Sequence, residues 1–197
     1  MVSPIQTRIL PTLNSLESIG PAGARRGRAR SVYDRYLPNV PETMVLSSPA
    51  FADGQPIPAR FTADGENISP PLAWKLTPAG TRSLAMIVED VDAPMPRPFV
   101  HWLTYNILPD ETALPEAIGP LPQVRAYGLV QGRNSFLRLG YIGCAPPKGR
   151  RPHHYHFQLF ALDCVLPLNP GKGRSSVIRS MAGHVLAKCR MVGTYQR

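Results

Sequence analysis

Two aspartates stand two residues apart, directly after an apolar run. Residues 83–88 read Ser-Leu-Ala-Met-Ile-Val, and Asp90 and Asp92 follow in the string Glu-Asp-Val-Asp-Ala-Pro. On an extended chain, residues i and i+2 lie on the same face. Two like charges on one face repel each other unless a cation, a proton or hydrogen-bond donors separate them. The pair is therefore either a solvated turn or part of a site that supplies one of these.

A histidine follows in the next apolar segment. His101 lies nine residues beyond Asp92, beside Trp102. A lone histidine at such a place is typical of a hydrogen-bonded core or rim residue. This interpretation changes only if carboxylates point at the ring.

A loop rich in glycine and proline precedes a strand that carries three histidines. The loop contains Gly143, Cys144 and Pro146, and its backbone can approach a ligand closely because glycine has no side chain. His153 and Tyr155 lie on one face of the strand that follows.

The histidine string also admits a metal ion. His154 and His156 share the face opposite to His153, so at most two of the three could meet one ion without distortion. A mixed site of histidines and aspartates stays open on ligand type.

These groups need a scaffold of strands. Short apolar runs alternate with Gly/Pro turns and predict strands at residues 44–47, 83–90, 100–108 and 154–163. The run at 83–88 is typical of a strand that is buried on both faces. Apolar residues recur at helical spacing over 175–188, which predicts a C-terminal helix. The pattern indicates a mainly β fold of antiparallel strands with this helix packed against it.

Composition narrows the class of protein. The chain of 197 residues suffices for one domain, and its 23 prolines disfavour a long helical bundle. Three cysteines without CxxC spacing indicate neither a disulfide framework nor a zinc knuckle. No stretch approaches the ~20 apolar residues of a membrane-spanning helix, and the start lacks the order of a secretory signal. We expect a cytoplasmic protein without a transmembrane segment.

The net charge of +9 favours anionic partners. The basic residues are scattered, however, and show no helix-turn-helix or zinc-finger spacing, so specific nucleic-acid binding is not expected. Residues 1–42 have few aromatic side chains and an arginine-rich stretch at 20–30. They are predicted to be a basic, poorly structured N-terminal extension, flexible or loosely docked, in front of a domain at 43–197. Their arginine bias is shared by organelle transit peptides, and an ordinary basic tail is favoured.

Several unusual strings occur together in one order: EDVDAP, VHWLTYNI, GRNS, GYIGCAPPKG, PHHYHFQLFALD and GHVLAKCRMVGTYQR. From residue 44 to the end, the chain resembles the phosphatidylethanolamine-binding protein family, in its bacterial Raf-kinase-inhibitor-like branch. The resemblance implies two packed antiparallel sheets and a small pocket for phosphate-like or carboxylate-like anions, such as phosphoethanolamine. The residues that match the pocket of the family are Asp90, Asp92, His101, Gly143, Pro146, His153 and Tyr155, and Cys144 is expected to join them in the loop that binds the ligand.

The resemblance implies a non-catalytic binding protein with no metal and no cofactor. Its partner would be a small anionic ligand, or a target such as a kinase or a protease that the protein regulates, and a homodimer is an option. A hydrolase that uses the same histidines and aspartates, through a metal or as acid and base, is the alternative. Two positions depart from the family pattern: Cys144-Ala145 in the loop, and His154 where arginine is common.

Overall fold

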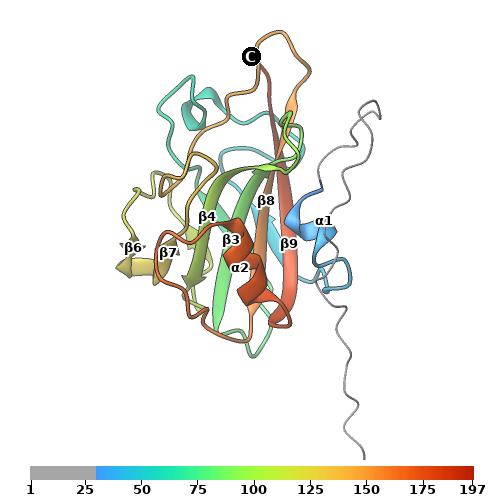
Figure 1. Ribbon diagram of the computed structural model, residues 1–197. Helices are drawn as coiled ribbons and strands as arrows, with labels where there is room; N and C mark the ends of the chain where they lie inside the picture. The colour runs from blue at the N-terminus through green and yellow to red at the C-terminus, as the bar shows by residue number, and fades with distance from the viewer. Residues whose placement is uncertain (1–29) are drawn as a thin grey trace, which may run out of the picture.

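The computed structural model describes residues 30–197, and strands dominate it (Figure 1). A six-stranded sheet has the order β6-β7-β4-β3-β8-β9, and a three-stranded sheet has the order β1-β2-β5. Every pair of neighbouring strands is antiparallel. The large sheet consists of β3 (Ser83–Asp90), β4 (Phe99–Ile107), β6 (Gln123–Val124), β7 (Leu129–Gln131), β8 (His153–Leu162) and β9 (Val185–Tyr195). The small sheet consists of β1 (Val45–Ser47), β2 (Leu72–Lys75) and β5 (Ala113–Leu114). The prediction of a mainly β fold with two antiparallel sheets is confirmed.

Helices are short and few in the described part of the chain. They are α1 (Val32–Arg35), α2 (Arg174–Met181) and two 3₁₀ turns at Ala59–Phe61 and Arg125–Tyr127. Over residues 30–197, neither α1 nor α2 has the length and apolar character to cross a membrane.

Strand β3 is the centre of the fold because both of its faces are buried. Leu84, Met86 and Val88 belong to the core between the two sheets. The alternate residues Ala85 and Ile87 belong to a second core on the opposite face, which α1 and α2 cover (Figure 1). This arrangement explains the uninterrupted apolar run, since a strand buried on both sides has no solvent-facing positions.

The helix predicted at 175–188 is correct only in its first half. α2 ends at Met181, and Gly183 then takes a positive φ of 82°, which glycine adopts at little cost. From Val185 the chain is a strand that pairs with β8 over its whole length, from Leu162 opposite Val185 onward. Spacing alone could not show this, because a short apolar run suits a helix and a buried strand equally well.

The described remainder of the predicted extension lies against the large sheet. Val32 and Tyr33 are buried, and the backbone N–H of Val32 donates to Glu89 Oε2 at 2.9 Å. The N–H of Tyr33 donates to Gln158 Oε1, also at 2.9 Å. Residues 1–29 of that extension lie outside the described residues. The division of the chain at residue 42 therefore stays a prediction.

Candidate functional site

A buried aspartate–histidine pair lies where β3 ends beside the start of β8. The antiparallel register sets Asp90 opposite Tyr155, which brings His153 close. His153 Nδ1 lies 2.7 Å from Asp90 Oδ2, and both side chains are less than a tenth exposed. The other oxygen of Asp90 accepts the backbone N–H groups of Asp92 at 2.8 Å and Ala93 at 3.1 Å. Because a carboxylate accepts, His153 donates through Nδ1, and Nε2 is the ring nitrogen left for a ligand.

His101 reaches the same place from β4. Its Nδ1 lies 2.7 Å from the carbonyl oxygen of Ile142, so Nδ1 carries a proton. Burial lowers the pKa of His101, while the Ile142 carbonyl and Asp90 raise it and His153 lowers it further. The net direction is downward, so the neutral ring is favoured and its Nε2 is an acceptor.

Tyr155 completes the cluster. Its ring stands edge-on to His101, with the ring centroids 5.1 Å apart, and its side chain is fully buried. The Cys144 thiol, a weak acceptor, lies beside its hydroxyl, which has no hydrogen-bond partner of ordinary geometry among the residues that the structure describes. Burial and the neighbouring Cys144 thiol raise the pKa of Tyr155, so the hydroxyl keeps its proton. A buried donor without a partner costs about 1–3 kcal/mol, which is a reason to expect a ligand at this hydroxyl.

The Gly/Pro loop is held tightly beside these groups. The N–H of Gly143 donates to Asn67 Oδ1 at 2.6 Å, and Cys144 accepts from Ala63 N at 3.0 Å through its carbonyl. A Cβ at Gly143 would come within 2.5 Å of the carbonyl carbon of Thr62. Only glycine permits this close approach. Pro146, three residues farther along the loop, is buried.

Asp92 has a histidine of its own. Its Oδ2 accepts the backbone N–H of His154 at 2.9 Å and lies 2.7 Å from His154 Nδ1. The two aspartates are thus kept apart by hydrogen-bond donors, which is one of the three solutions expected from the sequence. Of the predicted residues, the structure gathers Asp90, His101, Cys144, His153 and Tyr155, whereas Asp92 pairs with His154 instead.

Sequence reasoning missed two neighbours of the cluster. Phe99 packs against His101 with centroids 4.8 Å apart, and Phe136 meets Phe99 edge-on at 5.0 Å. Phe136 is 60% exposed, so this row of rings runs from His101 to the surface. The signal for Phe99 was present, since it stands two residues before His101 on the same face of a strand. Asn67, which holds the loop, gave no such signal.

Two hollows in the surface lie elsewhere. One of about 350 Å³ is lined by residues that include Tyr33 and Arg190, and one of about 250 Å³ by residues that include Asn67 and Tyr141. Neither is lined by Asp90, His101 or His153. The candidate site is identified by its polar groups.

Cys144 lacks the features of an activated nucleophile. Cys144 is buried, and burial together with Asp90 raises the pKa of its thiol well above the usual value, which disfavours the nucleophilic thiolate. Within residues 30–197, the side chains that bring three potential metal-ligand atoms within 4.8 Å of one another lie at another place in the fold. What the cluster does supply is one hydroxyl and two oriented imidazoles.

The sequence profile of the phosphatidylethanolamine-binding protein family matches residues 47–196. The chain belongs to this family. A UPF0098 protein of Methanothermobacter thermautotrophicus is 46% identical over 157 residues, which are 78% of this chain and 99% of the relative. A Mycobacterium tuberculosis protein named as a candidate lipoprotein, LppC, is 37% identical over 155 residues, which are 79% of this chain and 73% of the relative.

Solved structures of the phosphatidylethanolamine-binding protein family have the same fold. A family homologue from Chlamydia trachomatis is 34% identical, with a TM-score of 0.72 over 79% of this chain and 99% of the homologue. YbcL of Escherichia coli, described as a member of the mammalian PEBP family, is 30% identical, with a TM-score of 0.71 over 79% and 99% of the two chains. The family match begins at residue 47 and therefore leaves out α1, which packs on the large sheet.

Proposed function

We propose that this protein binds a small phosphate-type anion, such as phosphate or phosphoethanolamine, at the cluster of Asp90, His101, His153 and Tyr155. The observation that carries the proposal is the buried hydroxyl of Tyr155, which has no hydrogen-bond partner of ordinary geometry among the described residues and whose ring packs against His101. A phosphate oxygen would accept from this hydroxyl and remove the penalty of leaving it unpaired.

His153, His101 and the Tyr155 hydroxyl have complementary roles in this proposal. Asp90 fixes His153 through Nδ1, so Nε2 is the nitrogen that would meet the anion, as a donor when the ring is charged. His101, whose lowered pKa favours the neutral ring, accepts through Nε2. A phosphate group that keeps one O–H, as in a monoester monoanion or HPO₄²⁻, suits this combination because it carries acceptor oxygens for the donors and one O–H for His101 Nε2. Hydrogen bonds to a charged group contribute about 1.5–3 kcal/mol each, so a few of them give weak to moderate binding.

The loop and Asp92 have supporting roles in the proposal. Gly143 and Pro146 set the path of the loop, and Cys144 offers a backbone N–H where proline would offer none. Asp92 holds His154 and, through it, the start of β8.

The proposed test is calorimetric titration with phosphate and with phosphoethanolamine. The wild-type protein should bind, and a folded His153→Gln variant should not. Unchanged binding in the variant would refute the assignment of the site. Turnover of a phosphoester that depends on His153 would favour the hydrolase alternative, for which the site shows no activated nucleophile.

Regulation of a kinase or a protease is a further part of the proposal and rests on the resemblance to Raf-kinase-inhibitor proteins. In that case the anion would be a phosphorylated or acidic side chain of the target, and free phosphate should compete with the target for binding. The cytoplasmic location and the homodimer stay predictions, and one relative is named as a candidate lipoprotein.

A further inference from the structure

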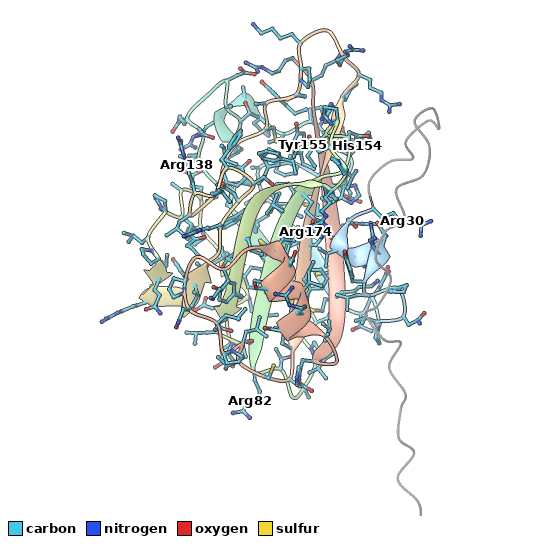
Figure 2. The ribbon with its side chains drawn as sticks, viewed as in Figure 1. Arg30, Arg82, Arg138, His154, Tyr155 and Arg174 are labelled. Carbon is cyan, nitrogen blue, oxygen red and sulfur yellow. The ribbon has the colours of Figure 1, made fainter. Side chains whose placement is uncertain are left out.

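Three side chains of metal-binding type meet at the far end of β8. Asp163 and Cys164 directly follow this strand, and His184 directly precedes β9. One ligand atom from each residue lies within 4.8 Å of the other two. The ten residues of β8 separate this group from the candidate anion site by roughly 30 Å, at ~3.3 Å per residue. Figure 2 shows this separation, with Tyr155 at one end of the sheet and Arg82, whose N–H donates to the carbonyl of Leu162, at the other.

We propose that Asp163, Cys164 and His184 form a binding site for a zinc-type transition-metal ion. A thiolate, an imidazole and a carboxylate are the three side-chain types that bind Zn²⁺, and water would take the fourth tetrahedral position. The sulfur ligand distinguishes such a site from one for Mg²⁺ or Ca²⁺, which prefer oxygen.

The backbone already holds all three residues in place. The N–H of Asp163 donates to the carbonyl of His184 at 3.1 Å, and the N–H of His184 donates to the carbonyl of Met181 at 3.0 Å. The carbonyl of Cys164 accepts from Ser83 Oγ at 2.6 Å. Binding an ion would therefore require only side-chain rotation.

The rotation required is small. Ligand atoms around a tetrahedral zinc ion lie about 3.5 Å apart, and the three ligand atoms here already lie within 4.8 Å of one another, so each needs to move by about an ångström at most. The side chains of Asp163 and His184 are 44% and 48% exposed, which leaves them room to move and leaves the ion a path to them.

Binding the ion would break only one weak interaction of the described part of the protein. His184 Nδ1 lies 2.8 Å from Asp163 Oδ1, and an exposed pair of this kind stabilises a fold only weakly. The Cys164 thiol would release its proton to solvent as the ion binds. Arg82 is a positive charge near Cys164 and opposes the ion, but it is exposed, so solvent and salt screen it.

Such an ion would join the end of β8 to the start of β9. It would close the connection that contains α2 and should therefore raise the Tm of the protein. The role expected from the geometry is structural, separate from anion binding.

Cobalt titration tests the proposal directly. The full chain, stripped of metal and kept reduced with a reductant that contains no thiol, is titrated with Co²⁺ and followed by absorption. We expect one equivalent to bind with a thiolate-to-cobalt charge-transfer band, and Zn²⁺ to displace it. In Cys164→Ser the charge-transfer band should disappear, and in His184→Gln the affinity should fall by about 100-fold or more, since the loss even of an outer-shell partner costs about 10- to 100-fold.

Two controls keep this test decisive. His154→Gln, at the other end of β8, should leave the cobalt spectrum unchanged, and Tm without metal should show that Cys164→Ser is folded. Absence of a stoichiometric band in the wild-type protein would overturn the proposal, and so would a band that survives in Cys164→Ser. In either case Asp163 and His184 form only a surface ion pair.

Discussion

Replacing Tyr155 by phenylalanine removes the one hydroxyl on which the proposed function depends. In the ligand-free protein this hydroxyl is buried without a hydrogen-bond partner of ordinary geometry among the described residues, an arrangement that costs about 1–3 kcal/mol. Removing it should therefore leave the free energy of unfolding unchanged or raise it by up to that amount. A Tyr→Phe change in a protein core ordinarily does the opposite, because it breaks a hydrogen bond.

Ligand binding should change in the other direction. The hydroxyl would donate to a charged phosphate, a bond that contributes about 1.5–3 kcal/mol. Its loss should weaken phosphate or phosphoethanolamine binding by about 10- to 150-fold, at 1.4 kcal/mol for each factor of ten. Urea unfolding measures the first quantity and calorimetric titration the second.

Tyr105 supplies a matched control. It is also buried, but its hydroxyl donates to the carbonyl of Asn169 at 2.6 Å. Tyr105→Phe should destabilise the protein by about 1 kcal/mol and leave the affinity for phosphate unchanged. If Tyr155→Phe behaves like this control, its hydroxyl has a structural partner and the reasoning is refuted.

Three further perturbations have defined outcomes. Burial lowers the pKa of His101, so below the unfolded-state pKa of about 6.5 the unfolded chain takes up a proton that the native ring resists. The free energy of unfolding, measured in urea, should therefore fall as the pH drops from about 6.5 toward about 5. The His101→Gln variant should flatten this dependence. Arg174→Met should lower the free energy of unfolding by about 3–5 kcal/mol, because Arg174 Nε lies 2.6 Å from the fully buried Glu89 and its removal leaves that carboxylate unpaired. Adding Glu89→Gln to this variant should restore part of the lost stability. A loss below about 1 kcal/mol in Arg174→Met would contradict the prediction. Gly143→Ala should lower Tm and weaken phosphate binding, since its Cβ would meet the Thr62 backbone at 2.5 Å; an unchanged Tm would show that the loop can shift.

The sequence predicts some parts of the fold well because their signal is local. The run at 83–88 is apolar at every position after Ser83, and such a run indicates a strand buried on both faces whatever its neighbours are. β9 carries no local signal of this kind. Val185 and Leu186 continue the helical spacing of α2, and only the pairing of this segment with β8 makes it a strand.

The site shows the same limit. Period-two alternation places His153 and Tyr155 on one face of β8, as expected. The partner of His153 depends instead on the register between β3 and β8, which sets Asp90 opposite Tyr155. Glu89 is the clearest omission. It belongs to the same acidic string, but it points to the other face of the sheet, where it accepts from Arg174 and from the N–H of Val32.

The central claim is that an anion binds between His101, His153 and Tyr155. Long-range ¹H–¹⁵N spectra of the five histidine rings, recorded during titration with phosphoethanolamine, test it most directly. We predict that the Nε2 resonances of His101 and His153 shift together and saturate, while those of His184 stay in place. A titration that moves neither His101 nor His153 would contradict the account.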